Sequence, residues 1–184
     1  VNDQLNKALT SKIPVIGFDS GVPNAPAGSV YANASTDNKA AGALAAENVY
    51  PAIKDKLAAG AAGKPIRIAV LSQDAVSESV TSRTLGFVEK MAELVKAGGI
   101  ADVAVVGHDK YKNGDEKAAK VVIDVGVSAT TSATDIASAG TALLSKDNVV
   151  AIFGSNESAA NGILDASNEG ADLNSKGILA VGFD

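Results

Sequence analysis

The chain has 184 residues, of which 46% are hydrophobic and 20% are charged, and its formal net charge is −5. This length suits about one domain of roughly 150 residues with a buried core. The negative charge disfavours nucleic acid as a partner, because a phosphate backbone would be repelled. No apolar run reaches the roughly 20 residues that span a bilayer, and the absence of cysteine excludes disulfides, thiolate metal sites and cysteine nucleophiles.

Short apolar runs alternate with segments of helical period along the chain, starting with a helix at residues 2–10 and a strand at 13–18. Further strands are predicted at residues 66–72, 103–107, 120–127, 149–153 and 178–183, and further helices at 38–59, 79–97, 134–145 and 158–169. Such alternation is typical of βαβ units. The predicted fold is therefore α/β, a doubly wound Rossmann-like parallel sheet with helices on both faces.

The segment from Val103 to Val127 departs from this pattern, because no helical segment separates its two apolar runs. An Asn-Gly pair at residues 113–114 lies between them. Asn-Gly between apolar runs is a strong hairpin signal, so we expect an antiparallel hairpin here. The extra residues from His108 to Glu116 have no predicted role, and His108, the only histidine, is interpreted as a solvated loop residue.

Polar side chains gather just after the predicted strands. In an open parallel sheet the ligand crevice lies beyond the carboxyl ends of the strands. The residues at these positions are Asp19, Ser20, Gln73, Asp74, Asn156, Glu157 and Asp184. Structural roles compete with binding at several of them: Asp19 could stabilise a turn and Asn156 could cap a helix. Capping also accounts for one residue of the run Ser35–Asn38, which opens a helix, but not for all of them.

Arg83 and two phenylalanines need separate interpretation. Arg83 lies in the early turns of its helix, where a cation opposes the positive end of the macrodipole. Either Glu78 offsets the unfavourable interaction of Arg83 with the helix macrodipole, or Arg83 points into the crevice toward a ligand. Phe18 and Phe183 each precede an aspartate. Because side chains alternate along a strand, each ring is expected on the opposite side of its strand from that aspartate. We expect both rings in the core rather than stacked on a ligand.

Catalytic motifs are not found. The sequence GSNES at residues 154–158 does not match the nucleophile elbow, no dinucleotide-binding fingerprint follows a strand, and DKYKNGD at 109–115 lacks essential ligands of a calcium loop. The protein is therefore predicted not to be an enzyme and to have no catalytic residue, cofactor or metal. The carboxylates, amides, hydroxyls and single Arg of the crevice suit a neutral polyhydroxylated ligand.

Five stretches, in this order, resemble one family. They are IPVIGFDSGV, STDNKAAG, SRTLGF, VVAIFGSNESAANGILDAS and ILAVGFD. Together they resemble the ribose-type sugar-binding proteins of bacterial ABC importers, which belong to the type I periplasmic binding proteins. The ligand-sensing core of lactose-repressor-type transcription regulators shares much of the same pattern and is the alternative.

The resemblance implies two Rossmann-like lobes, joined by three crossings, that close on a sugar. The ligand-binding residues that it implies are Asp19, Asn38, Arg83, Asn156 and Asp184. A second group of candidates is Ser20, Thr36, Ser79 and Thr131. Ser20 stands where ribose binders carry a second Arg, and no stacking aromatic occurs near Thr131. The sugar therefore need not be ribose.

The same resemblance gives expectations for organisation and partners. Residues 1–34 are expected to be the C-terminal tail of the first lobe, and 35–184 most of the second. Because the strand in GILAVGFD stops at Asp184, we expect a fragment of a longer protein, with weak or absent sugar binding by this half-cleft. Self-association through the apolar surface of residues 1–18 is a hypothesis. The expected partners are a monosaccharide or polyol and an ABC permease, and the expected location is extracytoplasmic, either periplasmic or lipid-anchored.

Overall fold

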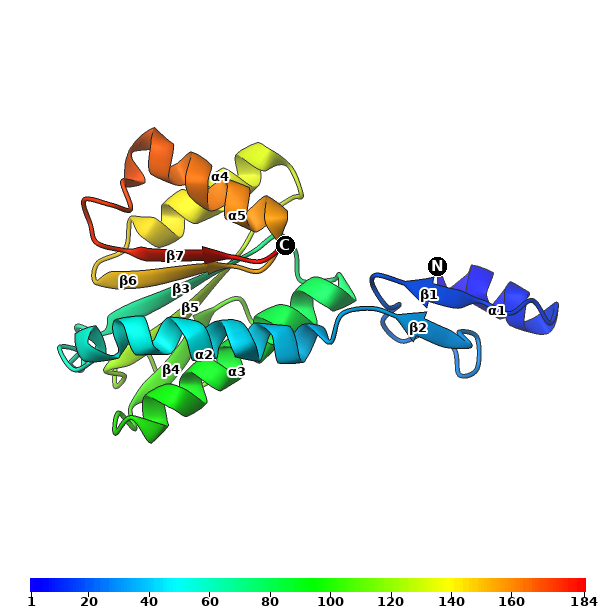
Figure 1. Cartoon of the computed structure of the whole chain (residues 1–184), viewed down its shortest axis with the longest axis horizontal. Coiled ribbons are helices and arrows are strands. Elements are labelled where there is room, and N and C mark those ends of the chain that lie inside the picture. Colours follow the sequence, from blue (N-terminus) through cyan, green and yellow to red (C-terminus); the bar gives the residue numbers. More distant parts are fainter.

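The computed structural model describes all 184 residues and consists of a large α/β body and a small N-terminal arm (Figure 1). The body contains strands β3 (Ile66–Ser72), β4 (Val103–Gly107), β5 (Val121–Val127), β6 (Val149–Gly154) and β7 (Leu179–Gly182). Its helices are α2 (Asn38–Leu57), α3 (Glu78–Ala97), α4 (Ala133–Leu144) and α5 (Glu157–Ala166), followed by a π-helical turn, η1 (Ser167–Ala171). None of these helices combines the length and apolar character of a transmembrane segment.

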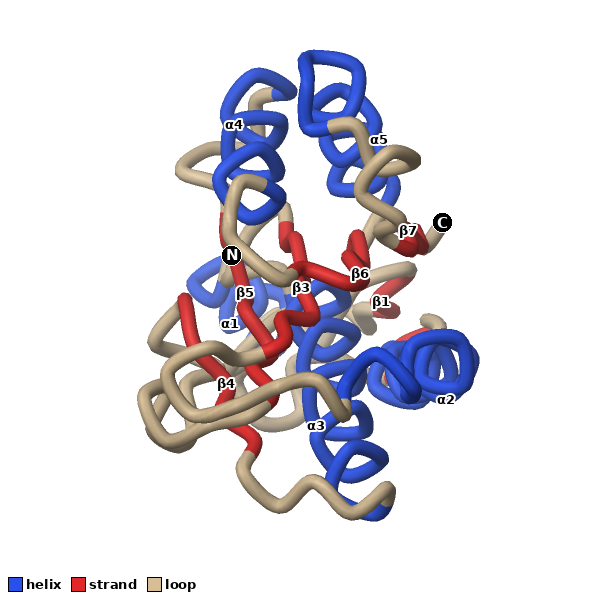
Figure 2. Tube along the Cα trace, turned by 90° about the vertical axis from the view of Figure 1, so that its left-hand side faces the viewer, coloured by secondary structure: helices blue, strands red, loops and turns tan.

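The five strands form one parallel sheet in the order β4-β5-β3-β6-β7. Helices α4 and α5 cover one face, and α2 and α3 cover the other (Figure 2). Two cores result. The larger lies between the sheet and α2/α3 and includes Phe87, whose ring stacks on Phe153 with centroids 4.3 Å apart. The smaller lies beneath α4 and α5. The predicted doubly wound α/β fold is confirmed.

The predicted hairpin between β4 and β5 is wrong. The two strands pair in parallel, with Val103 opposite Val121, and residues 108–120 return the chain to the starting edge of the sheet. Tyr111 and Ala119 of this crossover are 5% and 2% exposed, so they anchor it to the body where a crossover helix is usual. Asn113 still turns back, but onto β4, where it forms an isolated antiparallel bridge with Val105.

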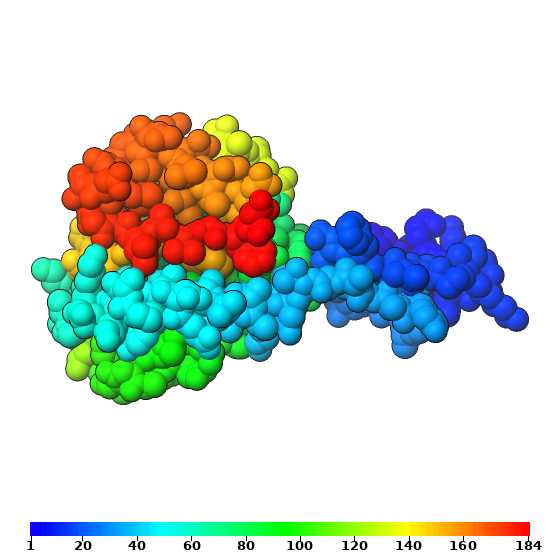
Figure 3. Space-filling model, in the orientation of Figure 1, coloured from blue at the N-terminus to red at the C-terminus, as the bar shows by residue number.

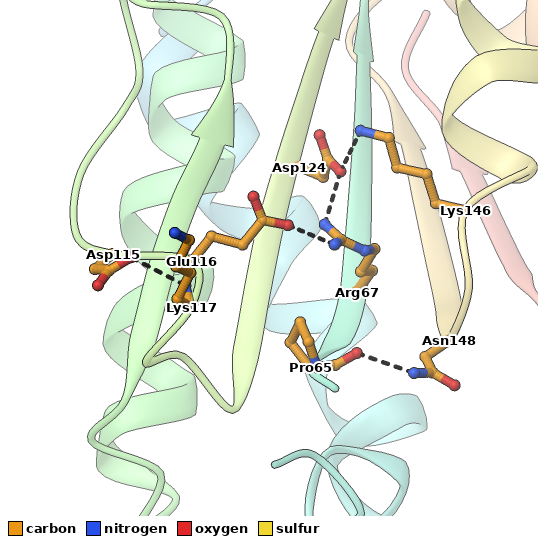
Figure 4. A network of polar contacts seen from close by, with 8 residues as sticks. All are labelled: Pro65, Arg67, Asp115, Glu116, Lys117, Asp124, Lys146 and Asn148. Atoms are coloured by element: carbon orange, nitrogen blue, oxygen red, sulfur yellow. Dashed lines mark hydrogen bonds and ion pairs between the residues drawn. The ribbon is translucent and has the colours of Figure 1, made fainter. Parts of the chain in front are cut away.

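A buried carboxylate fastens the crossover to the centre of the sheet. Asp124 of β5 is 1% exposed and accepts hydrogen bonds from Lys146 at 2.7 Å and from Arg67 at 3.1 Å. Arg67 also forms an ion pair with Glu116 of the crossover (Figure 4). Arg67 is the second residue of β3, so this network is close to the amino ends of the strands, away from the expected crevice.

The N-terminal arm comprises α1 (Asn2–Thr10), β1 (Ile16–Phe18) and β2 (Ala32–Ala34). The two short strands pair in parallel and the arm projects from the body (Figure 3). The expected strand at 13–18 is shortened to its last three residues, and β2 was not predicted. The placement of Phe18 in a core is wrong: its side chain is 84% exposed, because nothing packs on that face of the two-stranded ribbon.

Candidate functional site

A polar cavity of about 410 Å³ lies where β6 and β7 end, α3 and α5 begin, and the arm joins the body. The residues that line it are Asp19, Thr36, Ser79, Val80, Arg83, Asn156, Glu157, Ser158, Phe183 and Asp184. They come from both the arm and the body, which makes the cavity a junction between the two parts. This is the carboxyl end of the parallel sheet, where a ligand crevice is expected in this class of fold.

Arg83 is the only cation that lines the cavity, and it is held on several sides. Its Nη1 donates to the Ser155 carbonyl at 2.7 Å, and its Nη2 donates to Oδ1 of Asn38. The guanidinium lies 3.6 Å from the centroid of the Phe183 ring, in cation–π geometry. The residue is 8% exposed. Of the two interpretations of Arg83, the structure therefore favours the one in which it points into the crevice.

One buried donor of Arg83 remains without a partner. Its Nε makes no hydrogen bond within the chain. Burial lowers the pKa of Arg83 from its ordinary value, whereas the nearby Asp19 carboxylate raises it. The guanidinium therefore carries its charge in a poorly solvated place. Only two of its five N–H donors are hydrogen-bonded within the chain, so this residue of the cavity wall keeps donors that suit oxygen atoms of a ligand.

Close packing of α2 on α3 places Asn38 beside Arg83. A Cβ added at Gly42 would lie 2.0 Å from the Arg83 carbonyl oxygen, and one added at Gly86 would lie 2.0 Å from the Lys39 carbonyl oxygen. Only glycine permits this approach of the two backbones. Asn38 itself is 5% exposed, and its Nδ2 donates to the Thr36 carbonyl, which fixes the amide so that Oδ1 faces Arg83.

Three carboxylates border the cavity without a hydrogen-bond partner or an ion pair in the chain: those of Asp19, Glu157 and Asp184. Ionised carboxylates only accept hydrogen bonds, so they match hydroxyl or other donor groups of a ligand. The Asp19 backbone is left-handed, with φ of 68°, but its side chain makes none of the hydrogen bonds of an Asx turn. A turn-stabilising role for the Asp19 side chain is therefore not observed.

Asn156 combines a structural contact with a place in the cavity wall. Its Oδ1 accepts from the Ala159 amide at 3.2 Å, as an N-cap of α5, and its Nδ2 donates to Oε1 of Gln73 at 2.8 Å. The capping role is thus observed. Asp74 similarly accepts from the amides of Val76 and Ser77, which accounts for this strand-end carboxylate by local turn structure.

Two hydrogen bonds connect the arm to the amino end of α3. The Ser79 amide donates to Oγ of Ser20 at 3.3 Å, and the Gly21 amide donates to Oε2 of Glu78 at 3.4 Å. Glu78 also accepts from the Ser82 hydroxyl at 3.0 Å. These contacts hold the loop that carries Asp19 against the helix that carries Arg83.

The structure brings together most of the residues that the sequence singles out. Asp19, Arg83, Asn156 and Asp184 line the cavity, and Asn38 lies directly behind it against Arg83. In the second group, Thr36 and Ser79 line the cavity and Ser20 contacts Ser79, whereas Thr131 is exposed in the loop after β5 and does not line it.

Sequence reasoning missed three residues of the cavity wall, Val80, Ser158 and Phe183, and placed Glu157 at the crevice without naming it as a ligand residue. Glu157 and Ser158 occupy the first turn of α5, and this position could have identified them as ligand candidates, because helix starts surround the crevice in such folds. Phe183 is half-buried and packs on the larger core, as expected, but its ring also supports Arg83 at the cavity.

The fold and this cavity are those of one lobe of an α/β ligand-binding protein. The chain belongs to the periplasmic binding protein family, since the periplasmic binding protein domain matches residues 1–184. The predicted resemblance is thereby confirmed. Comparison with the curated proteins finds no match.

Solved structures agree with this assignment. An ABC transporter, LacI family transcriptional regulator from Brachyspira murdochii is 33% identical, with a TM-score of 0.75, and the match covers 100% of this chain and 55% of that one. A carbohydrate transporter solute-binding protein from Agrobacterium radiobacter, in complex with D-arabinose, is 26% identical, with a TM-score of 0.67 and coverage of 100% and 51%. A periplasmic component of an ABC-type sugar transport system from Hahella chejuensis shares the fold, at 23% identity, a TM-score of 0.68 and coverage of 99% and 53%. The chain spans about half the length of these proteins.

Proposed function

We propose that the chain supplies most of one lobe of a sugar-binding protein that delivers a small sugar or polyol to an ABC transporter permease. In this proposal residues 1–34 are the end of the first lobe and residues 35–184 are most of the second. The projecting arm supports the division, because it shares a cavity with the body but no common core. The ligand would be captured outside the cytoplasm, as in other importers of this family.

The observation that carries the proposal is that Arg83 and three carboxylates without a partner in the chain line the same cavity. Arg83 has N–H groups that make no hydrogen bond within the chain, while the exposed carboxylates of Asp19, Glu157 and Asp184 are acceptors without a partner in the chain. A sugar hydroxyl is both donor and acceptor, so it can bind to both kinds of group without adding charge. Hydrogen bonds to charged groups contribute about 1.5–3 kcal/mol each, so several of them support micromolar affinity after the ordering costs.

The proposed ligand residues are Asp19, Asn38, Arg83, Asn156 and Asp184, with Ser20, Thr36 and Ser79 close to them. Asn38 contributes by holding Arg83 rather than through a side chain on the cavity wall. The bound D-arabinose of the Agrobacterium radiobacter protein supports a monosaccharide as the ligand class. The lack of an aromatic residue near Thr131 means that stacking on the sugar would have to come from elsewhere in the protein.

The test is a thermal-shift screen of pentoses, hexoses and polyols on the protein at the length of its relatives. We expect one or a few neutral sugars to raise the midpoint of unfolding, and calorimetry to give micromolar or tighter affinity. The chain of 184 residues alone should bind the same sugar weakly or not at all, because it presents half of the cleft. A screen without any stabilising sugar would contradict the proposal, and micromolar binding by the 184-residue chain would contradict the half-cleft interpretation.

A second candidate is the effector-sensing core of a transcription regulator. It is favoured by the name of the Brachyspira murdochii protein, which contains both an ABC transporter and a LacI family transcriptional regulator. The two functions differ in what precedes this segment in the gene: an importer component needs an export signal, and a regulator needs a DNA-binding motif. Reading the upstream frame therefore separates them, and sugar binding alone does not.

A further inference from the structure

The chain contains two Asn-Gly pairs, and the structure places them in different surroundings. Asn113-Gly114 lies in the crossover between β4 and β5, and both of its residues are exposed. Asn161-Gly162 lies inside helix α5. The amide nitrogen that follows an asparagine can attack the carbonyl carbon of the asparagine side chain, and glycine hinders this attack least because it has no side chain. The two pairs are equal in sequence, so the fold decides which of them reacts.

The Gly114 amide in the crossover is free to react. It makes no hydrogen bond to the main chain, whereas the amide and the carbonyl of Asn113 both bond to Val105, at 2.9 and 2.7 Å. The fold requires glycine here, because the φ of Gly114 is 88° and an added Cβ would lie 3.3 Å from the Ala104 Cα. The turn therefore combines an exposed asparagine side chain with the least hindered nucleophile.

The Gly162 amide in α5 is protected. Within the helix it donates to the carbonyl four residues earlier, that of Ser158. Gly162 is also buried against α4, where an added Cβ would lie 2.5 Å from Cγ2 of Ile136. Turning the Gly162 nitrogen toward the side chain of Asn161 would break the helix at this point. Reaction of the second pair therefore requires local unfolding of α5.

We propose that Asn113 is a site of spontaneous deamidation in the folded protein and that Asn161 is not. The Gly114 nitrogen bonds to Cγ of Asn113, and its proton passes to the side-chain amide, which leaves as ammonia. The product is a cyclic succinimide. Water then adds to either ring carbonyl and cleaves its bond to the Gly114 nitrogen: addition at Cγ gives aspartate, and addition at the main-chain carbonyl gives isoaspartate. Water is the only co-reactant, and the proposal does not depend on sugar binding.

Both products change the attachment of the crossover to the sheet. Aspartate adds a negative charge next to Asp115 and Glu116, and Glu116 is the residue that pairs with Arg67 (Figure 4). Isoaspartate also reroutes the main chain through Cβ and Cγ of residue 113, so the carbonyl that accepts from the Val105 amide becomes a free carboxylate. Deamidation should therefore loosen the contact of the crossover with β4 as the protein ages.

Peptide mapping by mass spectrometry during incubation at mildly alkaline pH tests the site. In the folded chain, aspartate and isoaspartate should accumulate at position 113 at least about tenfold faster than at position 161, because α5 must open before Asn161 reacts. In denaturing urea the two pairs should react at similar rates. Equal rates in the folded chain, or an intact Asn113 over a time in which the urea-unfolded chain converts it, would overturn the proposal.

Two variants separate the chemistry from its consequence. Asn113→Gln keeps an amide but needs a larger ring, so isoaspartate at this position should disappear while circular dichroism stays that of the wild type. Asn113→Asp carries the new charge without the rerouted main chain. After ageing, the wild type should unfold at lower urea than Asn113→Asp, because isoaspartate disturbs the bridge to Val105. A urea midpoint that full conversion leaves unchanged would refute the loosening of the crossover.

Discussion

Replacing Arg83 with leucine should destabilise the body and remove the only cation from the cavity wall. The substitution deletes the hydrogen bonds to the Ser155 carbonyl and to Asn38 Oδ1, which are charge-assisted and contribute about 1.5–3 kcal/mol each. The contact with the Phe183 ring adds up to about 2 kcal/mol when desolvated. Relief of the buried charge offsets part of this loss, so we expect a net destabilisation of about 2–4 kcal/mol.

Urea unfolding of the 184-residue chain measures this change as a shift of the midpoint at constant slope. Lys39→Leu is a suitable control, because Lys39 pairs with Glu89 in an exposed ion pair on the same pair of helices. It should change the free energy of unfolding by less than about 1 kcal/mol. If Arg83→Leu unfolded at the wild-type urea concentration, the hydrogen-bonded and buried position of Arg83 would be incorrect.

Three further substitutions test other parts of the structure. Gly86→Ala forces a Cβ against the Lys39 carbonyl and should cost at least about 2 kcal/mol in urea unfolding, whereas Gly63→Ala meets no atom and should cost less despite its positive φ. Asp124→Ala leaves Arg67 and Lys146 without their buried carboxylate and should cost about 2–4 kcal/mol, a result contradicted by an unchanged urea midpoint. Tyr111→Phe removes a buried hydroxyl that has no partner, so at pH 7 the variant should be as stable as the wild type or more stable. Burial raises the pKa of Tyr111, because the folded state favours the neutral phenol. The stability of the folded state is unaffected by this preference below about pH 10, where the phenol is neutral in both states, and it falls as the pH rises from there through the folded pKa. The wild type should therefore lose stability relative to the phenylalanine variant above about pH 10, and a constant difference between pH 7 and pH 11 would contradict the burial of the phenol.

The strand and helix pattern was predictable where local periodicity and burial agree. Strand β3 is an apolar run that only Arg67 interrupts before Ser72 ends it, and α3 carries a regular apolar stripe, so both were placed within a residue or two of their observed bounds. The β4–β5 connection was not predictable, since Asn113-Gly114 is a true turn signal that here folds the chain onto β4 rather than joining two antiparallel strands. Tertiary anchoring by Tyr111, which sequence spacing does not reveal, decides the parallel outcome.

The site could be predicted in part for a similar reason. Asp19, Asn156 and Asp184 follow apolar runs, and strands of a parallel sheet end at one edge, so their proximity follows from the fold class. The contact between Asn38 and Arg83 depends on the close approach of α2 and α3 at Gly42 and Gly86, which no local pattern specifies. The role of Phe183 was missed because a ring can pack on a core and support a cation at the same time.

Calorimetric titration of Asp184→Ala tests the central claim most directly. The experiment uses the protein at the length of its relatives and the sugar that stabilises it most in the thermal-shift screen. The Asp184 carboxylate has no partner in the chain, so its removal should leave folding intact and cost about 1.5–3 kcal/mol of binding energy per lost hydrogen bond, a weakening of at least tenfold. The control Asp165→Ala, which removes an exposed carboxylate of α5, should bind as the wild type does. If Asp184→Ala bound the sugar as tightly as the wild type, the cavity would not be the sugar site.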